Sequence, residues 1–298
     1  MSKFANLFRI AYHGGDFHGS QVQPNVVTVE GVVKNILKNL GASSPLFASR
    51  TDKGVNATCN FITTTSNKKC KEYVGDFIER LEEYPIWITG FSDVEIDFNP
   101  RIAKEREYRY YVFNEKNKVL FNEAMQLFVG KHDFKNFARI LHSDVVDTRR
   151  TVKQIDVTSK GKVIMCEIRG LSFLWHQVRK MIGAASDVTN GRKNLTDIEK
   201  GLNGHKVDFT MAKAEFLTLS NIKYDNIEDC PILEWQTFCG ELNRLWNTTK
   251  NMIPDLDVEK DEQKLVAAEI FQQLIYDYAI YRKHPDRLKV LNFKLAEA

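Results

Sequence analysis

The chain has 298 residues, of which 43% are hydrophobic and 27% are charged, with a formal net charge of +3. This length allows one large domain or two small ones with a real core, and the composition is that of an ordinary soluble globular protein. The N-terminus carries no basic-then-apolar signal, and no uninterrupted apolar run approaches the length of a membrane span. A secreted or membrane-spanning protein is therefore not expected.

The cysteines are odd in number and widely scattered: Cys59, Cys70, Cys166, Cys230 and Cys239. No pair has the spacing of metal ligands. We therefore expect reduced, mostly buried thiols in a cytoplasmic protein, and no zinc or other metal.

Charge is unevenly distributed along the chain. Residues 1–99 carry a net charge of −1, residues 100–193 carry +9 and residues 194–298 carry −5. A basic segment of this size suggests a surface for a polyanion, built mainly by the middle of the chain. A solvated charged face without a partner is an equally good explanation from charge alone.

The first hundred residues predict the order β-α-β-β-α-β, approximately a ferredoxin-like unit. Thr28 is expected to cap the first helix, and apolar residues at helical spacing follow it. The second helix has Tyr73, Phe77 and Leu81 in register. The four expected strands cover residues 4–12, 46–48, 55–65 and 86–91. Many RNA-binding and metabolic domains share this unit, so the fold alone does not predict a function.

The turn between the second and third strands contains Arg50, Asp52 and Gly54. Gly54 can adopt the positive φ of a tight turn. On an extended backbone, Arg50 and Asp52 lie on the same side, so the guanidinium can pair with the carboxylate and keep it anionic at neutral pH. Such an aspartate can act as a nucleophile or a base, although most Asp-x-Gly turns have no catalytic role.

A basic loop, Asn99 to Lys104, precedes a strand rich in aromatic residues, Arg106 to Phe113. A period of two places Tyr108 and Tyr110 on one face. Aromatic strands are usually part of a hydrophobic core, and the alternative is that Tyr108 stacks on an RNA base.

The rest of the middle segment predicts two short helices, a hairpin, two further helices and a strand. These cover residues 118–128, 133–141, 151–169, 174–190, 195–203 and 217–224. Asp133 is expected to cap the second short helix. In the third helix, Trp175 and Arg179 lie one turn apart, and Gly191 ends it. Past Pro231, long helical patterns cover residues 233–247 and 259–281.

Three separated motifs resemble the TruA-type tRNA pseudouridine synthases, closest to their archaeal and eukaryotic members. The three motifs are Tyr12 to Gln21, Arg101 to Tyr110 and Gly170 to Met181. The Asp52 turn adds the signature Arg50-Thr51-Asp52-Lys53-Gly54-Val55, which resembles that of the same family. The resemblance covers roughly residues 4–225. The first motif departs from the family pattern at Ser20, where an aromatic residue is usual, and at His13, where Asp is common.

The resemblance implies that Asp52 is the indispensable residue of a tRNA pseudouridine synthase, an isomerase that needs no cofactor. Arg50, Tyr108 and Arg179 complete the expected catalytic set, with Arg179 approaching Asp52 from the other half. The expected tRNA contacts are Lys53, Arg101, Arg106, Arg149, Arg150 and His176. The target uridines are expected at positions 38–40 of the anticodon arm.

The predicted fold is α+β, with two ferredoxin-like or RRM-like halves that form a central, mostly antiparallel sheet with flanking helices. The expected domains are residues 1–99, a basic half over residues 100–230 and a helical C-terminal extension over residues 231–298. The expected partner is tRNA, with a homodimer left open.

Two other function classes stay open on the sequence. A catalytically silent binder of structured RNA would keep the basic surface but would not need the Arg50–Asp52 turn. An aspartate-based glycosidase needs a second carboxylate within about 5–10 Å, and no motif supplies one.

Overall fold

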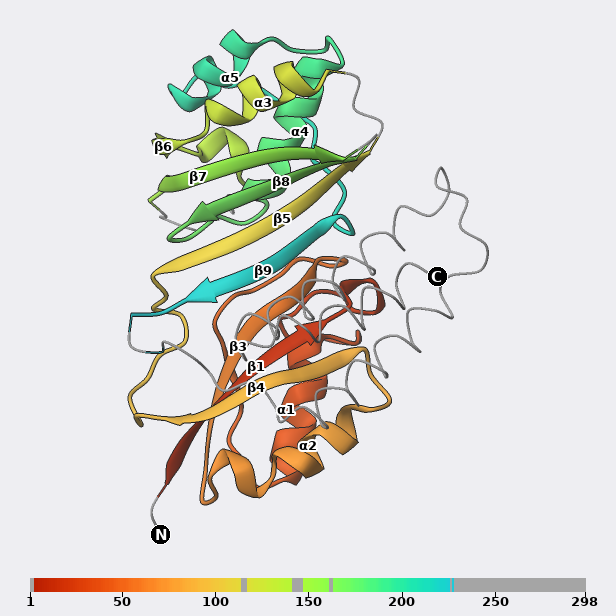
Figure 1. Ribbon diagram of the computed structural model, residues 1–298, viewed down its shortest axis with the longest axis vertical. Coiled ribbons are helices and arrows are strands. Elements are labelled where there is room, and N and C mark those ends of the chain that lie inside the picture. The colour runs from red at the N-terminus through yellow and green to blue at the C-terminus, as the bar shows by residue number, and fades with distance from the viewer. Residues whose placement is uncertain (1–2, 114–116, 141–146, 161–162, 226, 228–298) are drawn as a thin grey trace, which may run out of the picture. The chain divides into compact units, whose positions relative to one another are not determined.

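The computed structural model describes residues 3–113, 117–140, 147–160, 163–225 and 227 (Figure 1). Contacts divide these residues into two units, with the boundary between Ile102 and Ala103. The helical patterns expected over residues 233–247 and 259–281 lie outside the described residues, as do Cys230 and Cys239. Within the described ranges, no helix has both the length and the apolar character needed to cross a membrane.

Unit 1 has the predicted order of strands and helices. Its elements are β1 (Phe4–Tyr12), α1 (Val29–Asn39), β2 (Leu46–Phe47), β3 (Asn56–Ser66), α2 (Val74–Leu81) and β4 (Ile86–Val94), with short 3-10 turns at Gly14–Asp16 and Cys70–Glu72. The strands lie in the order β4-β1-β3-β2, and all three neighbouring pairs are antiparallel. Thr28 caps α1 as expected, because its Oγ1 accepts a hydrogen bond from the Gly31 amide at 3.2 Å.

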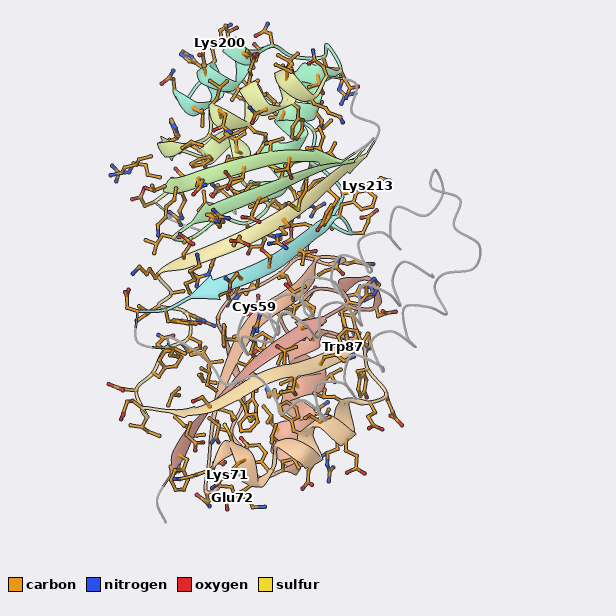
Figure 2. The ribbon with its side chains drawn as sticks, in the orientation of Figure 1. Cys59, Lys71, Glu72, Trp87, Lys200 and Lys213 are labelled. Atoms are coloured by element: carbon orange, nitrogen blue, oxygen red, sulfur yellow. The ribbon has the colours of Figure 1, made fainter. Side chains whose placement is uncertain are left out.

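The core of unit 1 lies between its sheet and its two helices. Phe8 on β1 makes edge-to-face contacts with Tyr73 at 5.7 Å and with Phe77 at 5.2 Å between ring centroids. Cys59 on β3 and Trp87 on β4, both labelled in Figure 2, are buried. Cys59, Cys70 and Cys166 are free and buried, as the sequence predicted.

Unit 2 consists of β5 (Glu105–Phe113), α3 (Lys118–Gln126), β6 (Gly130–Asp133), a 3-10 turn (Lys135–Phe137), β7 (Arg149–Lys160), β8 (Val163–Gly170), α4 (Gln177–Thr189), α5 (Leu195–Leu202) and β9 (Leu217–Lys223). Its strands lie in the order β9-β5-β8-β7-β6. If β6 is left out, each unit has four strands. When these four are numbered along the chain within their own unit, they lie side by side in the order 4-1-3-2 in both units. The α+β class and the antiparallel character of the sheet are thereby confirmed.

The helix predicted over residues 133–141 is wrong. The segment instead contains the end of β6 and one 3-10 turn, Lys135–Phe137. The side chain of Asp133 accepts hydrogen bonds from the Lys135 amide at 2.9 Å and from the Thr148 hydroxyl at 2.6 Å. These bonds stabilise a turn beside the β6–β7 pair and compete with helical hydrogen bonds.

One face of the unit 2 sheet carries a network of ion pairs that the sequence did not predict. Arg109 on β5 donates to Glu167 on β8 at 3.0 Å, and Arg169 on β8 donates to Glu107 on β5 at 2.9 Å. Ser220 on β9 adds a hydrogen bond to Glu107 at 2.9 Å. Because both glutamates are buried, these partners are needed to offset the desolvation of their charge.

Candidate active site

The loop between β2 and β3 holds Asp52 on a tight turn. Gly54 has a φ of +83°, and the Val55 amide donates to the Asp52 carbonyl at 3.1 Å. Burial alternates before the turn: Ser49 and Thr51 are buried, whereas Arg50 is exposed and Asp52 is half-buried. The backbone therefore points residues 49 and 51 into the protein and presents Arg50 and Asp52 together on the outer side.

Asn60 on β3 fixes Ser49 on the inner side of this loop. Its Nδ2 donates to the Ser49 carbonyl at 2.9 Å and to the Tyr12 hydroxyl at 3.3 Å. Its Oδ1 accepts from the Ser49 amide at 3.2 Å and from the Phe61 amide at 2.9 Å. All four hydrogen-bonding positions of this fully buried amide are thus used.

Tyr12 connects Asn60 to Thr51. Its hydroxyl lies 2.8 Å from Thr51 Oγ1, and because it accepts from Asn60, its own proton is available for Thr51. Burial raises the pKa of Tyr12 to about 12, against the opposing effect of these two hydrogen bonds. The phenol therefore stays neutral and remains a donor throughout the physiological range.

Ser20 holds Thr51 from another side. Its amide donates to the Thr51 carbonyl at 3.0 Å, and its Oγ accepts from the Thr51 amide at 2.8 Å. Ser20 occupies the position where the family pattern usually has an aromatic residue. Here it makes two hydrogen bonds to the backbone of Thr51, the residue next to Asp52. We call Tyr12, Ser20 and Asn60, with the Ser49 and Thr51 groups that they bind, the loop clamp.

Two glycines of the first motif pack directly against the Asp52 loop. A Cβ on Gly14 would lie 2.1 Å from the Val55 carbonyl oxygen, so only glycine fits there. Gly19 has a φ of +91°, and a Cβ on it would lie 3.1 Å from the Thr51 carbonyl oxygen. The first motif therefore supports the Asp52 turn through close backbone packing.

In unit 2, Tyr108 lies on β5 among buried side chains. It is 8% exposed, and its ring makes an edge-to-face contact with Phe173 at 5.3 Å. Tyr108 pairs with Ile168 on β8 and with Leu219 on β9. These contacts show how Tyr108 packs within unit 2, and its stacking on an RNA base stays a prediction.

Arg179 lies in the first turn of α4 and is 9% exposed. Its Nε donates to the Ala212 carbonyl at 2.8 Å, and its own carbonyl accepts from the Ala212 amide at 3.1 Å. Asp187, further along α4, binds the amide of Thr210 at 2.8 Å and its hydroxyl at 2.6 Å. The segment that contacts Arg179 is thus attached to α4 at two places.

The pKa of Asp187 lies below its usual range. Burial alone would raise this pKa, but hydrogen bonds from Thr210 and from Arg192 outweigh that effect. Arg192 Nε donates to Asp187 at 2.7 Å. Asp187 is therefore a carboxylate at neutral pH, with its charge used to hold the Thr210 segment.

The helix expected from Leu174 begins later, at Gln177. His176 precedes it with a φ of +66°, which interrupts helical geometry, so Trp175 is not one helical turn from Arg179. His176 is half-buried, and its ring lies 4.8 Å from that of Trp175 between centroids. Gly191, with a φ of +71°, follows the end of α4 as predicted.

Most of the expected tRNA-binding side chains lie in unit 2. Arg106 is half-buried and donates to the Leu171 carbonyl at 2.7 Å. Arg149 pairs with Asp147, with Nε 2.9 Å from Oδ1, and Arg150 donates to the Asp147 carbonyl at 2.6 Å. Lys53 and Arg101, both in unit 1, are exposed.

The structure brings the expected site residues together in two groups. Unit 1 holds Arg50 and Asp52 on one loop, and unit 2 holds Tyr108 and Arg179. The convergence of Asp52 with Tyr108 and Arg179 joins the two units, and it stays a prediction. No cluster of three His, Cys, Asp or Glu side chains suited to a metal ion occurs in the described ranges.

Three residues that support the segments of the site, Tyr12, Asn60 and Asp187, were not predicted from the sequence to have this role. Asn60 and Asp187 are polar residues inside apolar patterns, which is the signal that could have identified them. Their partners lie far away in sequence: Asn60 is 48 residues from Tyr12, and Asp187 is 23 residues from Thr210. Local periodicity does not identify such partners.

Comparison with known proteins first defines the class of enzyme. Residues 124–225 match a family model described as tRNA pseudouridine synthase. Enzymes of this class are isomerases. Among solved structures, a Cbf5–Nop10–Gar1 complex aligns over 90% of this chain and 59% of its own, but its TM-score of 0.37 and identity of 14% are too low to support an argument.

Curated relatives narrow the assignment. The chain is 40% identical to tRNA pseudouridine synthase A of Pyrococcus abyssi (strain GE5 / Orsay) over 232 residues, which cover 74% of this chain and 85% of that protein. It is 34% identical to tRNA pseudouridine synthase A of Archaeoglobus fulgidus over 233 residues, which cover 76% and 86%. The chain therefore belongs to the tRNA pseudouridine synthase A family, which confirms the resemblance drawn from its motifs and its activity as an isomerase.

Proposed function

We propose that this pseudouridine synthase acts on uridines at positions 38–40 of the tRNA anticodon arm, with Asp52 as its catalytic nucleophile or base. The observation that carries the role of Asp52 is the loop clamp. It holds the backbone at Ser49 and Thr51 through buried hydrogen bonds and leaves the side chains of Arg50 and Asp52 on the outer side. A rigid backbone at the catalytic residue supports the precise positioning of the reacting group that catalysis requires.

The reaction needs one activated carboxylate and no cofactor. The glycosidic bond breaks, the uracil turns in place, C5 bonds to C1′, and a proton leaves C5. Asp52 serves either by covalent attachment or by removing a ribose proton while the uracil anion departs. The site must exclude water, because a loose uracil anion would otherwise be lost.

We assign supporting roles to Arg50, Tyr108 and Arg179. Arg50 shares the outer side of the turn with Asp52, where its guanidinium contributes positive charge to the site. Arg179 is the partner expected from the other half of the enzyme, and its bond to Ala212 fixes its Nε. Tyr108 contacts the target uracil in this proposal, and its ring is oriented by Phe173.

We assign tRNA backbone contacts to Lys53, Arg101, Arg106, Arg149, Arg150 and His176. Arg106, Arg149 and Arg150 lie at one end of the unit 2 sheet, because Arg106 pairs with Gly170 and Gly170 pairs with Val152 near the start of β7. Asp147 offsets the charge of Arg149. Reversal of the charge at Arg101, Arg149 or Arg150 should weaken tRNA binding, and each lost phosphate contact should lower the salt dependence of binding.

We further infer that both units are ferredoxin-like halves, an inference supported by their common 4-1-3-2 strand order. A cytoplasmic location follows from the tRNA substrate in this proposal. A homodimer stays a prediction that light scattering of the purified protein would test.

The test uses unmodified tRNA transcripts that carry C5-tritiated uridine. We expect tritium release and pseudouridine mapped at positions 38–40. Modification at other positions would overturn the site assignment, while no release from any tRNA would favour the alternative, a silent binder of structured RNA. Free uracil in the products would favour a glycosidase.

A further inference from the structure

The segment between β8 and α4 exposes two large apolar side chains. Trp175 is 44% exposed and Leu171 is 51% exposed, although only six residues separate Gly170 from Gln177. Scattered apolar side chains on a surface need no explanation, but two from one short connection indicate a contact surface. We call residues 171–176 the Trp175 loop.

The Trp175 ring is held in place by its neighbours. The guanidinium of Arg139 lies 4.6 Å from the ring centroid, and the Arg139 amide donates to the Trp175 carbonyl at 2.9 Å. The His176 ring lies 4.8 Å from the indole, tilted by 51°. An aromatic surface that is ordered before binding loses little conformational entropy when a ligand stacks on it.

The backbone of the Trp175 loop is also fixed. His176 adopts a φ of +66°, a left-handed conformation that a residue other than glycine rarely adopts. The Leu174 amide donates to Gln177 Oε1 at 2.8 Å, and the Arg106 guanidinium donates to the Leu171 carbonyl at 2.7 Å. A non-glycine residue in this conformation persists only where its surroundings hold it, and such positions cluster at functional sites.

Arginines lie beside the start of the loop. The preceding strand ends at Gly170, which pairs with Arg106 on β5 and with Val152 on β7, near Arg149 and Arg150 at the start of β7. Asp147 offsets the charge of Arg149. Arg139 adds a further exposed guanidinium. An ordered aromatic ring among arginines is the combination that binds unpaired nucleotides, with stacking for the base and charge for the phosphate.

We propose that Trp175 is a stacking site for an unpaired nucleobase of the tRNA other than the target uridine. The base lies on the exposed part of the indole, and Arg139 keeps the ring oriented and contributes charge toward the neighbouring phosphate. Because every base can stack on an aromatic ring, the site contributes to the affinity for tRNA and to its positioning, and it does not select a particular base. The inference depends on tRNA as the substrate, and it does not depend on which uridine is modified.

The test compares Trp175→Ala, Trp175→Phe and the control Val119→Ala, whose side chain is 70% exposed at the start of α3. Trp175→Ala should raise the Kd for an unmodified tRNA transcript about 10- to 100-fold. The single-turnover rate at saturating tRNA should stay within about twofold of the wild type, because the contact stabilises the ground state and the transition state equally. Trp175→Phe should recover most of the affinity, and Val119→Ala should leave it unchanged.

Two further measurements separate stacking from charge and from misfolding. The slope of log Kd against log salt should be the same for Trp175→Ala and the wild type, because no phosphate contact is removed. In the intact protein, tRNA should quench a component of tryptophan fluorescence that Trp175→Phe lacks. Unchanged affinity in Trp175→Ala, or equal quenching in Trp175→Phe, would overturn the proposal. Because Kd is measured without turnover, a failure of the site assignment at positions 38–40 would leave these results unaffected.

Discussion

Replacement of Thr51 by valine removes one hydroxyl from the loop clamp and keeps nearly the same side-chain shape. The hydroxyl lies 2.8 Å from that of Tyr12, and Tyr12 is fully buried, so the phenolic proton loses its acceptor. A buried donor left without a partner costs about 1–3 kcal/mol. We expect the loop to move so that the phenol finds another partner, and this movement would displace Asp52, the next residue.

The magnitude follows from the precision that the chemistry requires. A displacement of about 1 Å at a reacting group costs about 100-fold in rate. We therefore expect the single-turnover rate of Thr51→Val at saturating tRNA to fall about 10- to 100-fold, which corresponds to about 1.4–2.7 kcal/mol in the activation free energy. Thr51→Ser keeps the hydroxyl and should stay within about threefold of the wild type.

The control is Thr64→Val on β3, the strand that follows the Asp52 loop. Thr64 is 3% exposed, and its hydroxyl donates to the Ser43 carbonyl at 2.7 Å, away from the Asp52 turn. Both valine variants should lose similar stability, with about 2–4 °C in Tm for each kcal/mol. Only Thr51→Val should lose the catalytic rate. A wild-type rate in Thr51→Val, or an equal loss in Thr64→Val, would refute a positioning role for the clamp.

Two other predictions concern the supports of the site. Asp187→Asn should lower the free energy of unfolding by about 1.5–3 kcal/mol at pH 7, because it weakens charged hydrogen bonds to Thr210 and Arg192. The pKa of Asp187 is lower in the folded protein than in the unfolded chain, where it is about 3.9. The difference in stability between the wild type and Asp187→Asn should therefore persist above a pH of about 3.9 and shrink as the pH falls through the folded pKa. Urea unfolding at several pH values would measure it. A difference that does not change with pH would contradict the ionic assignment. Gly14→Ala should abolish turnover, because the added Cβ would lie 2.1 Å from the Val55 carbonyl oxygen. The control is Gly75→Ala on α2, where the added Cβ meets open space; this variant should stay active and gain about 0.5–1 kcal/mol in stability. Turnover in Gly14→Ala equal to that of Gly75→Ala would contradict the close packing.

Features with local causes were predictable from the sequence. Thr28 begins a helix because a hydroxyl before an amphipathic pattern supplies the missing acceptor, and the structure has that bond. Gly54 marked the Asp52 turn because the turn requires a positive φ. The order β-α-β-β-α-β in unit 1 followed from apolar periodicity and from turn residues.

Features that depend on distant partners were not predictable. The helix expected over residues 133–141 failed because Asp133 binds Thr148, fifteen residues further on, as well as the nearby Lys135 amide. The start of α4 shifted to Gln177 because His176 takes a left-handed backbone that no local pattern required. The loop clamp joins Tyr12, Ser20 and Asn60 from three segments, and only the folded chain brings them together.

The proposed reaction depends above all on Asp52. The most direct test is a single-turnover tritium-release assay of Asp52→Asn on C5-tritiated tRNA, because the amide is nearly isosteric but can neither attack nor abstract a proton. We expect no release above the blank, with a Kd for tRNA within about tenfold of the wild type. Appreciable release by a preparation free of other pseudouridine synthases would contradict it.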